Sequence, residues 1–154
     1  MISVDSGMGQ VLAIRLEKND DLTTEVMRAV DHAGFSSAAI VAAAGSLQSL
    51  KFGVVSIQEG DVPRYTDVVE LDGAIEITGL QGHVGSEVDG SRTFHLHGTF
   101  ANSDGSVVAG HVYEAKVLVT VEITLIGTTQ VQWQRSAEEY ASGHTMPILL
   151  PSKV

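Results

Sequence analysis

The feature that most constrains the fold is a pair of strand-like segments on either side of a short polar loop. Residues 94–100 read FHLHGTF, and the loop at residues 102–106 contains the turn dipeptide Asp104-Gly105. Loops of this kind typically join two antiparallel strands, so residues 107–113 are the expected returning strand. Farther along, residues 117–124 alternate with the period of a half-buried strand. The sequence therefore predicts a β-rich fold built around this hairpin.

The same alternation predicts that three histidines lie together. On the first strand Leu96 and Phe100 fall on one face, while His95 and His97 fall on the other. A loop with an odd number of residues pairs positions equally distant from its centre, which puts His111 directly across from His97 and diagonal to His95. Such cross-strand neighbours have Cβ atoms about 4.5–5.5 Å apart. A slip of one residue would move His111 to the core face, so the cluster depends on this register.

Three converging imidazoles match the ligand set of an open metal site, with a fourth position left for water or substrate. The chain has no cysteine, so a metal must be held by His, Asp or Glu, and neutral imidazole favours zinc. Glu76 and Glu122 each interrupt an apolar strand and are candidates for a catalytic general base. Two simpler interpretations remain open: the histidines form a polar strand face without a metal, and each glutamate is an exposed strand residue.

The charge of the chain argues against direct binding to nucleic acid. Nineteen acidic and nine basic side chains give a formal net charge of -10 at pH 7, which repels phosphate backbones at long range. The Lys and Arg residues are scattered, so no basic patch is predicted. The N-terminus lacks signal-peptide features, and no stretch approaches the ~20 apolar residues that span a bilayer. We therefore expect a cytoplasmic protein without membrane contact.

The rest of the chain predicts an α+β fold in a single domain, 1–154, with its core at about 10–135 and a C-terminal tail at 136–154. Residues 10–16 form the first strand. Asn19 or Asp20 caps the one main helix, and Gly34 follows its end. The remaining segments give about seven or eight strands in a mostly antiparallel mixed sheet. The apolar residues 146–150 are expected to fold back onto the body or onto a neighbouring subunit.

Other polar residues are weaker candidates for a functional site. His83 lies among glycines and could line a pocket, although an ordinary loop position explains it as well. His32 lies near the end of the helix, where the helix dipole favours a cation, and His144 lies in the tail, where solvent exposure is expected. The arginines that could receive an anionic substrate, with surface charge as the simpler explanation, are Arg15, Arg64 and Arg92.

Residues 95–112, HLHGTFANSDGSVVAGHV, closely resemble the signature of the PPC domain, the "plants and prokaryotes conserved" domain also called DUF296. That signature is a His-x-His strand, a short loop ending near Asp-Gly, a Gly-Gly-His motif and a Val-rich strand with Glu. The matching positions are His95, His97, Asp104, Gly105, Gly110, His111 and Glu122. Ala109 stands where the first Gly is usual. The resemblance extends over nearly the whole chain and includes the Gln-Trp-Gln-Arg stretch at 132–135.

The resemblance implies a homotrimer of α+β subunits of the stand-alone prokaryotic type, in which the histidine cluster holds a metal, usually zinc. The fold is also similar to that of acetolactate decarboxylase, which holds zinc with three histidines. This likeness implies a zinc-dependent lyase or hydrolase type of activity on a small oxygen-containing molecule. Plant members join the domain to AT-hooks and act on DNA, so the alternative is a DNA-associated regulatory or protein-interaction module without catalysis. The Arg-Gly-Arg-Pro hook is absent from this sequence.

Overall fold

The structure is a computed structural model that describes residues 1–5, 7, 9–58, 62–139 and 145–154. Its elements follow one another as β1 (Gln10–Glu17), α1 (Leu22–His32), β2 (Ser37–Gly53), β3 (Val55–Gln58), β4 (Val62–Tyr65), β5 (Val69–Ser86), β6 (Arg92–Asn102), β7 (Val107–Thr128), β8 (Val131–Glu139) and β9 (Thr145–Lys153). Within the described residues, no helix is both long and apolar enough to cross a membrane.

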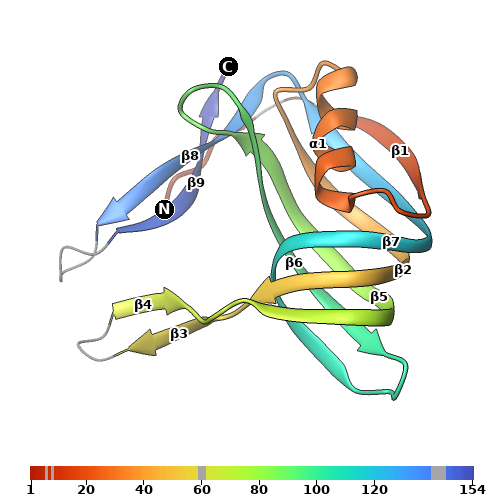
Figure 1. Ribbon diagram of the computed structural model, residues 1–154. Coiled ribbons are helices and arrows are strands. Elements are labelled where there is room, and N and C mark those ends of the chain that lie inside the picture. Colours follow the sequence, from red (N-terminus) through yellow and green to blue (C-terminus); the bar gives the residue numbers. More distant parts are fainter. Residues whose placement is uncertain (6, 8, 59–61, 140–144) are drawn as a thin grey trace.

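Seven of these strands form one strongly curved sheet (Figure 1). The strand order is β1-β7-β2-β5-β8-β9, and β6 pairs with both β5 and β7. Because β2 also pairs with β5 and β7, the strands β2, β5, β6 and β7 close into a ring. The pairing is antiparallel except for one parallel contact between Ser86 of β5 and Gln134 of β8. The predicted α+β class with a mostly antiparallel mixed sheet is confirmed in broad terms, although strands dominate and β3 and β4 form a separate pair.

The N-cap of the helix lies one residue after Asp20 and two after Asn19, the two residues predicted to cap it. Asp21 is the N-cap, and its carboxylate accepts a hydrogen bond of 2.8 Å from the backbone N–H three residues on. Asn19 instead adopts a left-handed conformation, with φ of 75°, and the Asp20 carboxylate accepts a hydrogen bond from the Glu17 N–H at 2.8 Å. Both residues are therefore used by the turn before the helix. Gly34, with φ of 71°, follows the helix end as predicted.

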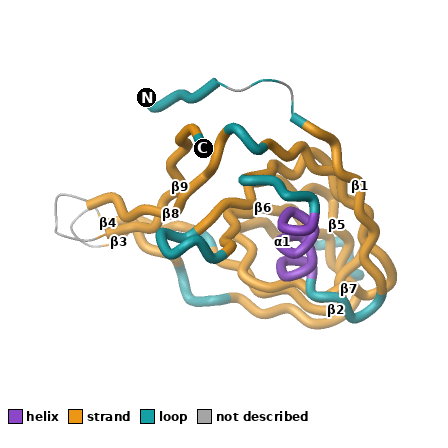
Figure 2. Tube along the Cα trace, turned by 90° about the horizontal axis from the view of Figure 1, so that it is seen from above, coloured by secondary structure: helices purple, strands orange, loops and turns teal. Residues whose placement is uncertain are grey.

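The core lies between α1 and the inner face of the curved sheet. Leu22, Val26 and Val30 of α1 are buried and belong to one hydrophobic cluster with inward-facing residues such as Leu96 and Val121. Figure 2, a view from above, shows α1 lying within the curve of the strands. Because the inner face is filled by the helix, polar side chains of the central strands are directed to the outer face.

Two hairpins project from the same side of the body (Figure 1). We call the pair β3 and β4 the lower arm, and the pair β8 and β9 the upper arm. The predicted tail forms much of the upper arm: Met146 lies opposite Glu138, and Leu150 lies opposite Gln134. The apolar tail thus folds back onto the preceding strand of its own chain.

Candidate metal centre

The three histidines meet on the outer face of the sheet. His97 of β6 lies directly opposite His111 of β7, and Gly98 lies opposite Gly110, which confirms the predicted register. The Nε2 atoms of His95 and His97 are 3.0 Å apart. The ring centroids are 5.0 Å apart for His95–His97, 5.1 Å for His95–His111 and 5.2 Å for His97–His111. One nitrogen from each ring lies within 4.8 Å of the other two, so this group could hold a metal ion.

The alternation of the strands explains why these side chains face outward. Leu96 is 0% exposed and Phe100 is 1% exposed on the inner face, which fixes the opposite orientation of the histidines between and beside them. Glycine is required where the strands come closest. A Cβ at Gly110 would lie 2.5 Å from the carbonyl oxygen of Gly53 on β2, so a side chain there would force the strands apart.

The surroundings keep the imidazoles of His95 and His111 neutral. Burial, followed by the charges of His95, His97 and Arg135, lowers the pKa of His111 from 6.5 to about 4. The pKa of His95 is lowered as well, first by burial and then by His97, Arg135 and His83. A metal ligand must be a neutral imidazole, so these two rings are ready for coordination at neutral pH without losing a proton.

The spacing of one nitrogen pair, from His95 and His97, resembles that of two ligands on a zinc-sized ion. With Zn–N bonds of about 2.0–2.1 Å, two ligands of a tetrahedral site are roughly 3.3 Å apart, close to the 3.0 Å between His95 and His97. Within the described part of the chain, the buried Nδ1 of His111 has no hydrogen-bond partner. An unpartnered buried nitrogen costs roughly 1–3 kcal/mol. A cation coordinated there would offset that cost.

Two tyrosines lie on the side of the cluster nearest the lower arm. The ring centroid of Tyr65, at the end of β4, lies 5.0 Å from that of His111, and the Tyr113 centroid lies 5.1 Å from it. Burial is the largest cause that raises the pKa of both phenols, and the charge of Arg135 opposes it at Tyr65. Both hydroxyls therefore stay protonated at neutral pH and can donate hydrogen bonds to a molecule at the cluster.

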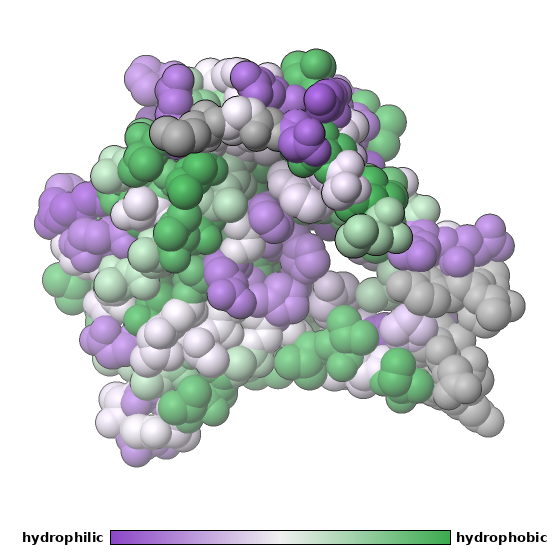
Figure 3. Space-filling model, turned by 180° about the vertical axis from the view of Figure 1, so that it is seen from behind, coloured by the Kyte–Doolittle hydropathy of each residue, from purple (hydrophilic) through white to green (hydrophobic). Residues whose placement is uncertain are grey.

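The upper arm encloses the opposite side. Trp133 of β8 lies on His83, with ring centroids 4.6 Å apart, and His83 lies opposite His95 in the sheet. Burial lowers the pKa of His83, so the ring is neutral, and its place beside the cluster favours the pocket interpretation over that of a loop residue. Figure 3 shows the surface hollowed between the two arms, with hydrophilic side chains gathered beside the hollow.

The sequence did not predict that residues of the two arms, Tyr65, Trp133 and Arg135, belong to the site. The only available signal was the Gln-Trp-Gln-Arg stretch of the family resemblance, which contains Trp133 and Arg135. Tyr65 gave no signal, because it lies more than 40 residues from His111 in the sequence and reaches it only through the lower arm.

The two predicted catalytic glutamates lie outside the group of metal-ligand atoms. Glu122 forms an ion pair with Arg15 of β1 at 3.7 Å, and both side chains are more than half exposed. Glu76 is exposed and lies opposite Ser46 of β2 and Ala101 of β6. Their roles as general bases stay predictions.

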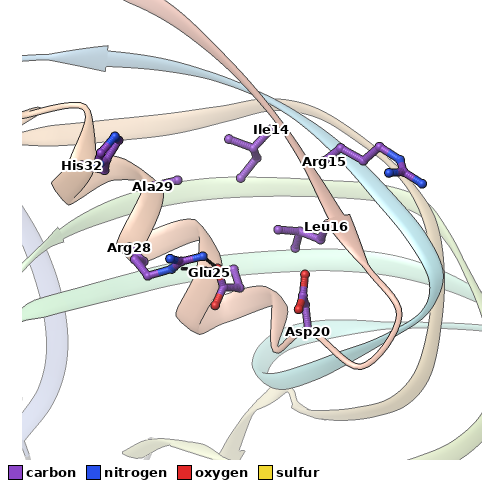
Figure 4. Close-up of a pocket in the computed structure, with 8 residues that line it drawn as sticks. All are labelled: Ile14, Arg15, Leu16, Asp20, Glu25, Arg28, Ala29 and His32. Atoms are coloured by element: carbon purple, nitrogen blue, oxygen red, sulfur yellow. Dashed lines mark hydrogen bonds and ion pairs between the residues drawn. The ribbon is translucent and has the colours of Figure 1, made fainter.

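A separate groove of about 360 Å³ lies between β1 and α1 (Figure 4). Inside it, Glu25 forms an ion pair with Arg28 one turn along the helix. Arg15 points away from the helix and pairs with Glu17 at 3.2 Å. His32 lies at the helix end, as predicted. The charges around this groove therefore largely neutralise one another.

The remaining weak candidates for a functional site lie away from the three histidines or outside the residues that the structure describes. Arg92 ties the end of the helix to β6, because its guanidinium donates to the carboxylate of Asp31 at 2.6 Å and to the carbonyl oxygens of Phe35 and Ser36. Arg64 is exposed on β4. The predicted solvent exposure of His144 concerns a residue outside the described ranges.

Comparison with known proteins gives one family and several related folds. The model of the Plants and Prokaryotes Conserved (PCC) domain matches residues 4–129. Among solved structures, a metal-containing protein from Archaeoglobus fulgidus is 24% identical, with a TM-score of 0.78 over 96% of this chain and 99% of that one. A plant- and prokaryote-conserved protein from Pyrococcus horikoshii is 23% identical, with a TM-score of 0.74 over 95% and 96%.

A third structure, from Ralstonia eutropha, is named as a candidate DNA-binding protein and is 16% identical, with a TM-score of 0.70 over 90% of each chain. At these identities the likeness concerns the fold. A comparison with curated proteins gave no match.

Proposed function

The chain belongs to the Plants and Prokaryotes Conserved domain family, and from that premise we propose that its three histidines hold a zinc ion and with it bind and transform a small oxygen-containing molecule. The activity would be of a zinc-dependent lyase or hydrolase type. The observation that carries this proposal is the convergence of one nitrogen from each of His95, His97 and His111 within 4.8 Å.

Other features of the site support the same proposal. The imidazoles of His95 and His111 are neutral, and His95 and His97 line hollows in the surface, where a small molecule can reach them. The similar A. fulgidus protein is described as metal-containing. A three-histidine set leaves a coordination position open, unlike a closed structural site with four protein ligands.

The residues around the cluster supply the contacts that a ligand would need. Zinc, when bound, would polarise a carbonyl or activate a water molecule. The rings of Tyr65 and Tyr113 lie beside His111, and hydroxyls of this kind can stabilise a developing negative charge on oxygen by donating hydrogen bonds to it. The Trp133 ring packs against His83 on the other side, with centroids 4.6 Å apart, and adds an aromatic surface that a ligand could contact.

The test is metal content, measured by mass spectrometry on tag-free protein. Wild type should carry near-stoichiometric zinc, His97→Ala should lose it, and His32→Ala, which removes an exposed histidine elsewhere, should keep it. If wild type and His97→Ala are equally metal-free after zinc is supplied, the proposal fails. If zinc is bound but only raises thermal stability, and no carbonyl or carboxylate compound binds, the metal has a structural role alone.

We also propose that the protein assembles as a homotrimer. The outer face of β1, β7 and β2 carries exposed apolar side chains, among them Val11 at 71% and Val119 at 63% exposure. Val11 lies opposite Ile126, another exposed apolar residue, and exposed apolar residues that lie together are typical of an interface. Light scattering coupled to size-exclusion chromatography should give three times the chain mass of 16.3 kDa. A monomer in this measurement would contradict the proposal.

A DNA-associated role is the competing proposal, and the name of the similar R. eutropha protein supports it. The formal net charge of -10 opposes it. The discriminating measurement is the salt dependence of any DNA affinity. A DNA-binding protein shows a steep loss of affinity with salt, because phosphate contacts release counterions. We expect no measurable affinity even at low salt.

A further inference from the structure

The upper arm brings Arg135 of β8 to the part of β6 that precedes His95 and His97. Its strand β8 crosses the outer face of β5 at Gly85, where an added Cβ would lie only 2.1 Å from the carbonyl oxygen of Trp133. The Trp133 N–H donates to the Ser37 hydroxyl at 2.7 Å, which anchors the crossing. The next residue but one, Arg135, then reaches across to β6. Its position is therefore set by backbone contact between strands and is independent of the histidines.

Hydrogen bonds hold the guanidinium of Arg135 in one orientation. Its Nη2 donates to the hydroxyl of Thr93 at 2.6 Å and to the carbonyl oxygen of Phe94 at 2.9 Å. Its Nε donates to the carboxylate of Glu87 at 3.3 Å. The side chain is only 20% exposed. Among the described residues, none of these hydrogen bonds uses Nη1, so this one nitrogen of a fixed, charged guanidinium can still donate.

Thr93, which the guanidinium contacts, lies near the proposed metal ligand His95 on β6. Thr93 and His95 are two residues apart on the same face of β6, and this separation is about 6.6 Å along a strand. The charge of Arg135 also lowers the pKa of His95, His111 and Tyr65. Arg135 therefore acts electrostatically on both sides of the cluster.

We propose, resting on the metal site proposed above, that Arg135 makes this a site for small hydroxy or oxo acids. Arg135 receives the carboxylate of the ligand, while the hydroxyl or carbonyl oxygen of the same ligand occupies the open position of the metal.

The chemistry of the surroundings favours a carboxylate over other anions. A hydrogen bond from the charged guanidinium through Nη1 to a carboxylate oxygen is charge-assisted, and such hydrogen bonds are shorter and stronger than neutral ones. Glu87 already forms an ion pair with Arg135, so only part of the arginine charge is left to attract a ligand. A phosphate monoester carries nearly two negative charges, and Glu87, 3.3 Å from Nε, would repel the second. Two hollows of about 400 Å³ each are lined by the proposed metal ligands, one by His97 and the other by His95 and His97.

The experiment uses zinc-loaded protein and three probes of increasing length: glycolate, 3-hydroxypropanoate and 4-hydroxybutanoate, each beside its uncharged primary amide. Calorimetry gives the dissociation constants for wild type, for Arg135→Gln and for Arg64→Gln, a control that removes an exposed arginine from the lower arm. The ratio of acid to amide affinity is the readout, because a purely structural role of Arg135 would weaken both ligands alike.

We expect wild type and Arg64→Gln to prefer at least one acid over its amide about tenfold or more, since a hydrogen bond to a charged group contributes that much. Arg135→Gln should bind acid and amide equally. The inference is overturned if all three proteins hold zinc and Arg135→Gln keeps the preference, if wild type shows none, or if no probe binds. If wild type holds no zinc, the proposed function fails and this inference fails with it.

Discussion

Acidification should destabilise the metal-free protein through His111, and the size of the effect follows from its surroundings. Burial and the neighbouring positive charges lower the pKa of His111 from 6.5 in the unfolded chain to about 4 in the folded protein. Between these values the unfolded state binds the proton and the folded state does not, so the free energy of unfolding falls as pH falls. The His111 contribution is therefore fully present above pH 6.5 and is lost progressively down to pH 4.

The magnitude follows from the difference of about 2.5 between the two pKa values. Each pKa unit corresponds to 1.36 kcal/mol, so the full loss is about 3 kcal/mol, and about 2 kcal/mol of it has occurred at pH 5. Because the pKa of His95 is lowered too, its titration adds to the loss in the same direction.

The assay is urea unfolding of chelator-treated protein at pH 7 and pH 5, with wild type compared against His111→Gln. Carboxylates contribute to acid sensitivity in both proteins, so the difference between them isolates His111. The variant should lose about 2 kcal/mol less than wild type over this interval, while His32→Gln should behave as wild type. An identical pH dependence in wild type and His111→Gln would refute the reasoning, because the ring would then be as solvated folded as unfolded.

Three further predictions concern the stability of the strands that carry the histidines and the effect of zinc on it. Gly110→Ala should destabilise the protein by about 1–3 kcal/mol in urea unfolding, because its Cβ would lie 2.5 Å from a backbone oxygen of β2; Ala109→Ser, at an exposed neighbour, should change little. Leu96→Ala should cost about 2–5 kcal/mol by the same measurement, because it opens a cavity beneath the histidines, whereas Val107→Ala at an exposed position should stay within about 0.5 kcal/mol. Saturating zinc at about 100 times its dissociation constant should raise the free energy of unfolding by roughly 2.7 kcal/mol, and His97→Ala should show no such gain.

The histidine cluster could be predicted from sequence because everything that positions it is local. The period of a strand separates His95 and His97 from Leu96, and a short loop of odd length fixes which residue faces His97. These rules act within about twenty residues and leave few alternatives, and the observed pairing of His97 with His111 confirms them.

The rest of the site depends on contacts between distant segments, which periodicity does not encode. Tyr65 and Arg135 reach the cluster from the lower and upper arms, and each arm is positioned by where its strand leaves the body. The strands of the arms read as ordinary β segments in the sequence, and the direction in which they project is set by pairing across the whole sheet. The prediction of the helix cap was wrong for a local reason. Three acidic or amide residues follow one another, and each of these residue types can cap a helix. Only the backbone conformation selects Asp21.

The closed ring of strands couples the core to the site. On β6, alternate residues belong to the hydrophobic core and to the histidine cluster, so the inner packing of Leu96 and Phe100 determines where His95 and His97 point. Because β6 pairs with β5 on one edge and with β7 on the other, it cannot shift to absorb strain without breaking a pairing. A rigid strand that carries two of the three proposed ligands, with the third on its neighbour, holds one nitrogen of each ring within 4.8 Å of the other two, which preorganises the group for a metal. The arms are less constrained, since the lower one is a pair outside the main sheet. Metal affinity should therefore follow the integrity of the ring, whereas ligand preference should follow the residues on the arms.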